Sequence, residues 1–474
     1  MKTVLTPDIC VIGAGSGGLS VAAGAAAFGV KVVLVERARM GGDCLNTGCV
    51  PSKSLIAAAK HAHAIAEAPK FGITAGLPQV DFSAVNERVK SVIAAIAPND
   101  SIERFTGLGV EVISASARFV SEDTVEAGDV IIRPRRFVIA TGSAPFIPPI
   151  PGLETVEYLT NESLFDLTRL PEHLLIIGGG PVGLEMAQAH RRLGARVTVV
   201  QSGKALAKED PELSRIVIDR IRQEGVILHE DTSIQSVERT GTGVRLVCQT
   251  AAGPIEIEGS DLLVAAGRAA SLDGLGLDAA GIKHDRKGVA VGAGLRSSNP
   301  RVYAIGDAAG GLQFTHVAGY HAGLVLQQIL FRLPARENRT ILPRATYTSP
   351  EIATIGLSER EARETAGAIE VLRWPLAEND RAQAEGECAG LIKIIVDRRT
   401  RILGVAIVGA GAGEMINMWT LAMTNRMKLK HVRGYVSAYP TMSEIGKRAV
   451  MSYYAPVAAK PLVRSLLRFL RLFG

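Results

Sequence analysis

The stretch Asp8-Ile-Cys-Val-Ile-Gly-Ala-Gly-Ser-Gly-Gly-Leu19 decides the fold that this chain can adopt. A short apolar strand runs into Gly13, Gly15 and Gly18, and an alanine-rich helix follows. The glycines permit a tight turn, approach of a pyrophosphate to the backbone, and close packing of helix on strand. The next apolar strand ends in Glu36, where an acid can bind a ribose hydroxyl. Together these features predict a Rossmann-type dinucleotide-binding unit.

The same pattern returns later in the chain. A second apolar strand enters Gly178, Gly180 and Gly183, and the strand after the next helix ends in Gln201. Glu36 and Gln201 each fall 23 positions after the first glycine of their unit (36 − 13 and 201 − 178). Two such units predict two bound dinucleotides, one held permanently and one that exchanges.

Two further apolar runs end in glycine, at Ala140-Thr-Gly-Ser143 and at Arg301-Val-Tyr-Ala-Ile-Gly-Asp307. Each is typical of a buried parallel strand that meets a ligand.

A redox-active dithiol is predicted at residues 41–53, Gly-Gly-Asp-Cys-Leu-Asn-Thr-Gly-Cys-Val-Pro-Ser-Lys. Cys44 and Cys49 would lie roughly 7.5 Å apart along a regular helix, beyond the usual Cα span of a disulfide. The segment must therefore bend, and Gly48 and Pro51 suit a joint followed by a helix start. Cys49 would then lie near a helix N-terminus, which favours its thiolate.

Three other interpretations of these cysteines compete. A structural disulfide is disfavoured because the chain has five cysteines and no export signal. Zinc is disfavoured because Cys10, Cys248 and Cys388 stand alone, without a second pair of ligands. We therefore predict no metal site, and two unpaired buried cysteines remain the alternative.

The segment 41–53 resembles the redox-active segment of the class I pyridine nucleotide-disulfide oxidoreductases, which include dihydrolipoamide dehydrogenase, glutathione reductase and mercuric reductase. The resemblance implies FAD and a second cofactor, NAD or NADP. It also implies that Cys49 faces the flavin, that Cys44 exchanges with substrate, and that Lys53 lies beside flavin N5 in an ion pair with Glu185. A solvated helix charge is the alternative for Glu185.

The resemblance further implies that Asp307 binds the ribityl chain of FAD. His316 could lie near the flavin, although a hydrogen-bonded packing role is the simpler interpretation. The motifs and the resemblance together give the expected cofactor-binding residues Gly13, Gly15, Gly18, Glu36, Gly42, Thr141, Gly142, Asp307, His316, Gly178, Gly180, Gly183, Gln201 and Gly267.

The expected fold is α/β, with two Rossmann-like dinucleotide-binding domains, the second inserted in the first, and an α+β C-terminal dimerisation domain. We expect the FAD-binding domain at residues 1–151 and 271–339 and the NAD(P)-binding domain at 152–270. The resemblance places the dimerisation domain at 340–455, followed by a basic amphipathic tail at 456–474. It implies a homodimer in which the partner subunit completes each active site.

The chain departs from most of the family at Tyr439, in Ser-Ala-Tyr-Pro-Thr-Met-Ser-Glu444. This position usually holds a histidine that exchanges protons with the thiol and pairs with the glutamate. A phenol with a pKa near 10 is a poorer base at neutral pH than imidazole. Mercuric reductases also carry tyrosine here but add a cysteine pair near the C-terminus, whereas the last cysteine of this chain is Cys388. We still expect Tyr439 and Glu444 to lie at the catalytic site.

The net charge of +6 is concentrated in the last nineteen residues, which hold Lys460, Arg464, Arg468 and Arg471 and no acid. Without them the net charge is 6 − 4 = +2, which argues against a nucleic-acid footprint. Apolar residues alternate with these bases at helical spacing, so the tail either lies on an anionic membrane surface or packs across the dimer. We expect a cytoplasmic protein, because no apolar run or cleavable signal suits membrane insertion or export.

These features predict an FAD-dependent NAD(P)H oxidoreductase in which the Cys44–Cys49 pair passes electrons between nicotinamide and a small or protein-bound disulfide or dithiol substrate. Two alternatives stay open. One is a mercuric-reductase-like metal or quinone reductase, and the other is a membrane-docked, nucleotide-binding redox sensor without fast turnover.

Overall fold

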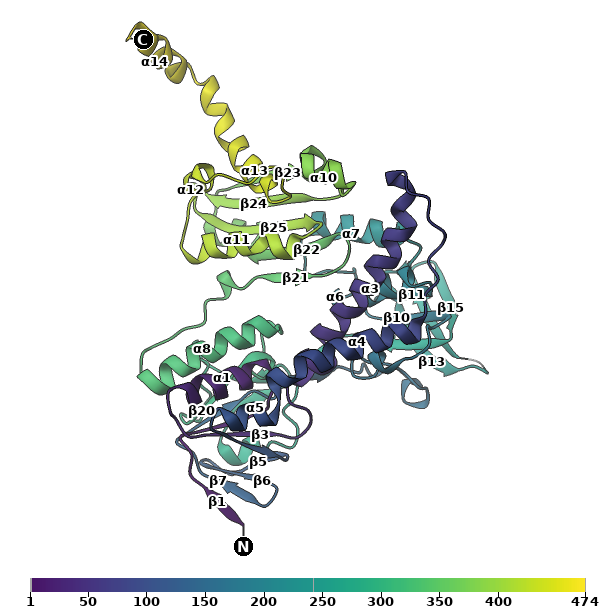
Figure 1. Ribbon diagram of the computed structural model, residues 1–474, viewed down its shortest axis with the longest axis vertical. Coiled ribbons are helices and arrows are strands. Elements are labelled where there is room, and N and C mark those ends of the chain that lie inside the picture. Colours follow the sequence, from purple (N-terminus) through teal and green to yellow (C-terminus); the bar gives the residue numbers. More distant parts are fainter. Residues whose placement is uncertain (1, 242, 474) are drawn as a thin grey trace. The chain divides into compact units, whose positions relative to one another are not determined.

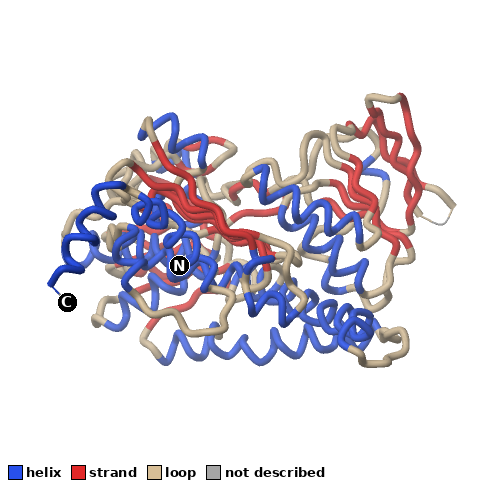
Figure 2. Tube along the Cα trace, turned by 90° about the horizontal axis from the view of Figure 1, so that it is seen from above, coloured by secondary structure: helices blue, strands red, loops and turns tan. Residues whose placement is uncertain are grey.

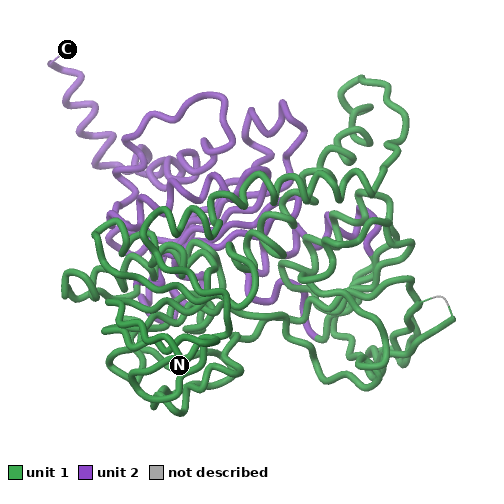
Figure 3. The backbone as a smooth tube through the Cα atoms, turned by 60° about the horizontal axis from the view of Figure 1, so that its bottom comes forward, with its two compact units in different colours: residues 1–202, 227–337 green, residues 203–226, 338–474 purple. Residues whose placement is uncertain are grey.

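The computed structural model describes residues 2–241 and 243–473. The chain divides into two compact units, of residues 1–202 with 227–337 and of residues 203–226 with 338–474 (Figure 3). We call them unit 1 and unit 2 and consider each by itself.

The first sheet of unit 1 is the parallel five-stranded sheet that the opening motif predicts (Figure 1). Its strands in spatial order are β20 (Val302–Ala304), β8 (Arg136–Ile139), β2 (Ile9–Ile12), β3 (Val32–Glu36) and β4 (Val110–Ser114). Strand β20 pairs with β8 although more than 160 residues separate them. A second Rossmann-like domain is therefore inserted between the two strands, as predicted.

The inserted unit has its own parallel sheet, of β12 (Ile227–His229), β11 (Arg196–Val200), β10 (His173–Ile177) and β16 (Asp261–Val264). An antiparallel sheet accompanies it, of β13 (Ser233–Arg239), β14 (Val244–Thr250) and β15 (Gly253–Gly259). Helix α6 (Pro181–Arg192) follows β10 as α1 (Ser16–Ala27) follows β2, which confirms the predicted repeat.

The remaining strands of unit 1 form small sheets: β1 (Thr3–Leu5), β7 (Val130–Ile132), β6 (Thr124–Ala127) and β5 (Ala117–Ser121); β9 (Ser143–Pro145) with β17 (Arg268–Ala270); and β18 (His284–Asp285) with β19 (Gly288–Val289). Its other helices are α2 (Gly42–Asn46), α3 (Cys49–Glu67), α4 (Phe82–Ile96), α5 (Ile102–Gly107) and α8 (Thr315–Phe331). Helices lie against the strands of the sheets, as Figure 2 shows.

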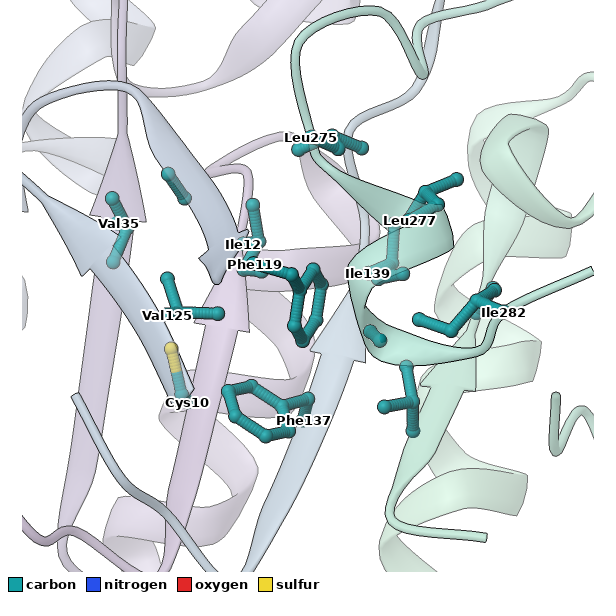
Figure 4. Packing of buried hydrophobic residues seen from close by; sticks show 14 of the residues in the cluster. Cys10, Ile12, Val35, Phe119, Val125, Phe137, Ile139, Leu275, Leu277 and Ile282 are labelled. Carbon is teal, nitrogen blue, oxygen red and sulfur yellow. The ribbon is translucent and has the colours of Figure 1, made fainter. Parts of the chain in front are cut away.

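One core of unit 1 packs β2 and β8 against the small sheet of β5 and β6 (Figure 4). The rings of Phe119 and Phe137 meet edge to face at 4.9 Å. Cys10 lies fully buried in this cluster, and burial raises its pKa to about 12. Cys10 is therefore a packing residue.

Unit 2 is built on one antiparallel sheet, in the order β21 (Arg344–Thr346), β22 (Glu351–Gly356), β25 (Ile402–Gly409), β24 (Leu391–Asp397) and β23 (Ile369–Pro375). Its helices are α7 (Pro211–Gln223), α9 (Glu359–Ala366), α10 (Asp380–Glu385), α11 (Ala412–Thr424), α12 (Leu429–Gly434), α13 (Glu444–Tyr454) and α14 (Pro461–Leu470). Trp419 of α11 is the largest side chain in its buried cluster.

The division into units differs from the predicted domain boundaries. The predicted FAD-binding and NAD(P)-binding domains fall together in unit 1, and residues 338 and 339 group with unit 2. Residues 203–226, which the sequence assigns to the second nucleotide-binding domain, group with unit 2. Helix α7 contacts strands β22 and β25 of the unit 2 sheet. The buried Lys393 Nζ lies 2.7 Å from Asp210 Oδ2, at the start of α7, which ties the helix to this sheet.

None of the described helices combines the length and apolar character needed to cross a membrane.

Candidate functional site

The dithiol segment bends where the sequence predicts. Helix α2 ends at Asn46 and α3 begins at Cys49, so the two cysteines lie on different helices. A Cβ at Gly48 would come within 2.8 Å of Asp43 Oδ2 and 2.9 Å of its carbonyl oxygen. Glycine is required at the joint because the chain folds back closely onto Asp43.

Cys44 and Cys49 are both thiols in this structure, and their side chains hydrogen-bond to each other. The hydrogen bond from Cys44, followed by Thr315 and the charge of Lys53, lowers the pKa of Cys49 to about 6 against the cost of burial. The pKa of Cys44 is raised, chiefly by that same hydrogen bond to Cys49. Cys49 is therefore the thiolate of the pair at neutral pH.

Two side chains support the Cys49 sulfur. The Thr315 hydroxyl, at the first position of α8, lies 3.4 Å from Cys49 Sγ. Lys53 Nζ, one turn along α3 from Cys49, lies 2.8 Å from Glu185 Oε2. The ion pair expected between Lys53 and Glu185 is thus present, and Glu185 is nearly buried on α6.

A polar network extends from Asp43, the neighbour of Cys44. The Asp43 carboxylate lies 3.3 Å from Arg268 Nη2 and accepts a hydrogen bond from Asn161 Nδ2 at 2.8 Å. Arg268 Nε donates to Ser143 Oγ at 2.7 Å, and that hydroxyl donates to Asp307 Oδ2 at 2.5 Å. Burial raises the pKa of Asp307. The network links the redox segment to the aspartate expected to bind the ribityl chain.

The first glycine turn fits a dinucleotide. A Cβ at Gly18 would lie 1.9 Å from Gly13 O, whereas one at Gly15 would meet nothing within 4 Å. The N-terminus of α1 therefore faces open space just where a pyrophosphate would approach. Glu36 Oε2 accepts the Ala14 N–H at 2.6 Å, at the mouth of this turn. Thr141 Oγ1 is buried without a hydrogen-bond partner among the described residues, which also suits a bound ligand.

The second glycine turn has the same geometry. A Cβ at Gly183 would lie 1.9 Å from Gly178 O, and one at Gly180 would meet nothing within 4 Å. Gly15 and Gly180 have identical backbone angles as the N-caps of α1 and α6, φ −78° and ψ −179°. Gln201 Oε1 accepts the Gly179 N–H at 2.7 Å, as Glu36 does in the first turn. Both sites therefore suit a dinucleotide phosphate.

A groove of about 900 Å³ runs between α3 and α4 and has Cys49 at one end. The residues of α3 that line the groove recur at helical spacing, and they include small or apolar side chains such as Ala57, Ala62 and Ile65. Val85 and Val92 stand on the α4 wall. The groove therefore offers a largely apolar path along the helices to the thiolate.

Tyr439 and Glu444 belong to unit 2, whereas the thiols belong to unit 1. The Tyr439 hydroxyl donates to Asp380 Oδ2 at 2.8 Å, and this bond raises the pKa of the phenol. Glu444 Oε1 lies 3.0 Å from Arg448 Nε. Their placement at the catalytic site thus stays a prediction.

The proximity of His316 to the flavin stays a prediction. The His316 ring stacks on Phe314 with centroids 5.3 Å apart, and its neighbour Thr315 makes the contact with Cys49. The buried His321 accepts the Gly306 N–H and lies 3.1 Å from Glu337, which is a packing role. No group of three metal-ligating side chains occurs among residues 2–241 and 243–473.

Comparison with known proteins explains this arrangement. Residues 7–322 match the family described as pyridine nucleotide-disulphide oxidoreductase, and residues 342–450 match its dimerisation domain. This chain is a pyridine nucleotide-disulphide oxidoreductase. The family has FAD and a pyridine nucleotide as its cofactors, and the dimerisation domain indicates a homodimer.

Relatives of this oxidoreductase include mercuric reductases and dihydrolipoyl dehydrogenases. It is 36% identical over 459 residues to the mercuric reductase of Streptomyces lividans, covering 95% of this chain and 97% of that protein. It is 30% identical over 452 residues to the dihydrolipoyl dehydrogenase of Bacillus subtilis (strain 168), covering 94% and 98%.

Among solved structures, LpdA from Mycobacterium tuberculosis aligns with a TM-score of 0.86 at 26% identity, over 96% of this chain and all of that one. The flavoprotein disulfide reductase RclA from Escherichia coli, described as induced by HOCl, aligns with a TM-score of 0.84 at 26% identity, over 94% and 99%.

Five residues of this oxidoreductase site were missed by sequence reasoning: Asp43, Ser143, Asn161, Arg268 and Thr315. Asp43 lies inside the redox segment, beside Cys44, and Thr315 directly precedes the predicted His316, so both had a signal in the sequence. Arg268 directly follows the predicted Gly267. Asn161 had no signal, because a lone asparagine in a loop reaches the site through tertiary structure alone.

Proposed function

We propose that this oxidoreductase passes two electrons between NADH or NADPH and a disulfide or dithiol substrate through the Cys44–Cys49 pair. The observation that carries the proposal is the placement of two free cysteines, Cys44 on α2 and Cys49 at the start of α3, with the Thr315 hydroxyl 3.4 Å from Cys49 Sγ. The lowered pKa of Cys49 is consistent with this placement. Bound FAD would supply the two-electron carrier between the nicotinamide and the thiols. The residues expected to hold it are those of the first glycine turn, with Thr141 and Asp307.

The thiol chemistry follows from the hydrogen bond within the pair. Transfer of the Cys44 proton to Cys49 makes Cys44 the nucleophile, and Cys44 attacks one sulfur of the substrate disulfide. A mixed disulfide forms, and the first substrate thiolate leaves and takes a proton from solvent. Cys49 then loses its proton and attacks the Cys44 sulfur, which forms the Cys44–Cys49 disulfide and releases the second thiolate. Oxidation of a dithiol is the same sequence in reverse.

A lipoyl-type substrate is favoured by the several relatives that carry the name dihydrolipoyl dehydrogenase. The apolar groove along α3 is lined by Cys49 and not by Cys44, so it leads to the flavin-facing thiol and not to the thiol that attacks the substrate. The proposed homodimer would supply Tyr439 and Glu444 of the partner subunit to each Cys44.

A second candidate function is reduction of a metal ion or a quinone. It is favoured by four relatives at 32 to 36% identity that are named mercuric reductase. Cys44 and Cys49 would be the thiol pair that binds such a metal as substrate. Cys10 and Cys248 are buried in separate cores and Cys388 is half-buried, so these three are unsuited to a second pair.

A steady-state assay of the FAD-loaded dimer separates these functions. NADH and NADPH are each tested with lipoamide, glutathione disulfide, Hg(II) in excess thiol, and a short-chain quinone. We expect lipoamide or a related disulfide to be the best acceptor, and Cys44→Ser to abolish that activity. A higher kcat/KM for Hg(II) or quinone would favour the second function, and absence of turnover with every acceptor would contradict both.

A further inference from the structure

The helix α14 is the feature of unit 2 that the oxidoreductase chemistry leaves unused. It spans Pro461–Leu470, after the turn η9 (Ala455–Ala459), and η10 (Arg471–Phe473) follows it. The match to the dimerisation domain ends at residue 450, before this segment. Within unit 2, α14 leads away from the β21–β25 sheet (Figure 1). The core of unit 2 is therefore closed without it.

The side chains of α14 form two faces. At 100° per residue, Leu462, Leu466, Phe469 and Leu470 fall on one side and the arginines on the other. The apolar face is open, with Leu462 84% exposed and Phe469 56% exposed. Phe473 extends this face, and its ring meets Phe469 edge to face at 5.1 Å.

The opposite face carries the basic side chains. Arg464, Arg468 and Arg471 line it, Lys460 precedes it, and residues 456–474 contain no acid. Within the described part of the chain, no ion pair neutralises these four charges. An open apolar face bordered by uncompensated positive charge is complementary to a surface that has both hydrocarbon and anionic groups.

We propose that α14 docks this oxidoreductase on the surface of an anionic lipid bilayer. The helix would lie in the interface, with its leucine and phenylalanine side chains in the acyl region and its arginines among the phosphates. At about 15 Å long it cannot span a hydrocarbon core of about 30 Å. The proposal does not depend on which substrate the thiols reduce.

The charge of the chain favours an anionic lipid surface over a second copy of this chain as the partner of α14. Outside the last nineteen residues the net charge is +2, so a second copy offers no anionic surface overall. An anionic leaflet attracts each basic residue near it by about fivefold in binding.

Co-sedimentation of the full-length, FAD-loaded dimer with vesicles tests the proposal. Vesicles of phosphatidylcholine with about 30% phosphatidylglycerol are compared with pure phosphatidylcholine at about 20 mM salt. We expect binding to the anionic vesicles that falls at least about tenfold in Arg464→Glu/Arg468→Glu. Leu466→Glu/Phe469→Glu should lose binding as well. The control Arg398→Glu/Arg399→Glu, in the exposed turn after β24, removes the same charge and should bind less weakened than either α14 variant.

Light scattering and flavin absorbance are measured on the same variants. Retained dimer and flavin in both α14 variants, together with lost sedimentation, would support docking on lipid. Dissociation of the dimer in Leu466→Glu/Phe469→Glu would overturn the proposal, because α14 would then pack on the partner subunit. Absence of binding at low salt, or equal loss in the Arg398/Arg399 control, would overturn it too.

Discussion

Thr315 is the residue that most directly shapes the thiolate without being part of a recognised motif. Its hydroxyl approaches Cys49 Sγ from the start of α8, while Cys44 approaches from α2. Two hydrogen bonds and the Lys53 charge outweigh the burial that would otherwise raise the pKa of Cys49. Charge stabilisation at this sulfur therefore comes from three different segments of the chain.

We expect alkylation of Cys49 by iodoacetamide in the reduced protein to titrate with an inflection at about pH 6. The thiolate is the reactive form, so labelling is fast above this pH and declines below it. Thr315→Val should raise the inflection by about one pH unit, because a hydrogen bond to a charged group contributes about 1.5 kcal/mol or more. Peptide mass spectrometry follows the labelling.

Ser54→Ala is the matched control, since its hydroxyl bonds to Val50 O on the same helix. It should leave the inflection unchanged. An inflection near pH 8.5 in the wild type, or no change in Thr315→Val, would refute the assignment.

Tyr439 is the second residue whose protonation bears on the thiol chemistry. Its hydrogen bond to Asp380 raises the pKa of the phenol, so the hydroxyl stays neutral across the working pH range. A neutral phenol donates a hydrogen bond but does not readily accept a proton from a dithiol. We expect Tyr439→His to raise dihydrolipoamide oxidation at pH 7 to 8 by about 10²-fold, measured as kcat with NAD. Tyr439→Phe should not raise it, and equal rates in wild type and Tyr439→His would remove Tyr439 from the acid–base position.

The two βαβ units are the elements that carry nucleotide choice. Glu36 and Gln201 accept the same kind of backbone N–H at the ends of β3 and after β11, so the geometry is shared and the charge differs. A neutral amide neither repels nor attracts a 2′-phosphate strongly. The second glycine turn is therefore expected to prefer NADH over NADPH only modestly.

Gln201→Glu should raise the ratio of kcat/KM for NADH over NADPH by about tenfold or more, because the carboxylate repels the 2′-phosphate. Steady-state kinetics with both nucleotides measure this ratio, with Gln235→Glu on β13 as the control. A wild-type preference for NADPH beyond about a hundredfold, roughly 2.7 kcal/mol, would contradict the expectation.

Lys393 ties two elements of unit 2 together. Its buried ammonium on β24 lies 2.7 Å from Asp210, 3.2 Å from Glu212 and 2.8 Å from Glu359. Lys393→Met would leave Asp210 without its cation, whereas Glu212 and Glu359 would keep Arg373. The free energy of unfolding should therefore fall by about 3 kcal/mol in urea at pH 7. Lys430→Met, at an exposed position, is the control.

The free energy of unfolding should depend on pH through Glu359. The ion pair with Lys393 lowers the pKa of Glu359 to about 2, from 4.5. A lowered carboxyl pKa stabilises the folded state fully above about pH 4.5, and this stabilisation is lost as the pH falls towards 2. Wild-type stability should therefore fall over that range. Lys393→Met should fall less, because protonation relieves repulsion among its carboxylates, and an equal decline in both proteins would count against this role.

For the whole molecule, the dimer is the functional unit that the dimerisation domain indicates. Two chains of 50.1 kDa give 2 × 50.1 = 100.2 kDa, which light scattering should report. The proposed site draws Cys44 and Cys49 from one subunit and Tyr439 from its partner. Each site would then fail on loss of either contribution.

Mixed dimers test this arrangement directly. As homodimers with the best acceptor, Cys44→Ser chains should be inactive and Tyr439→Ala chains should be much slower than the wild type. Random mixing gives half heterodimers, and each heterodimer would have one intact site, so about a quarter of wild-type activity should return. Absence of recovery in verified heterodimers would show that both residues serve the same subunit's site.

Elements whose signals are local could be predicted from the amino-acid sequence. Glycine spacing placed both dinucleotide turns, and five positions between Cys44 and Cys49 required the bend at Gly48, because backbone geometry permits few alternatives. Alternating apolar strands and helices predicted the inserted Rossmann unit, and resemblance supplied the Lys53–Glu185 ion pair.

Which distant polar groups meet depends on the tertiary structure. Thr315 reaches a cysteine 266 positions away, and Arg268 reaches both Asp43 and Ser143 through loops of the inserted unit. It also decided that residues 203–226 join unit 2, through the charges around Lys393. Such contacts leave no periodic trace in the sequence, because they depend on the packing of whole elements, whereas turns and helix starts depend on neighbouring residues.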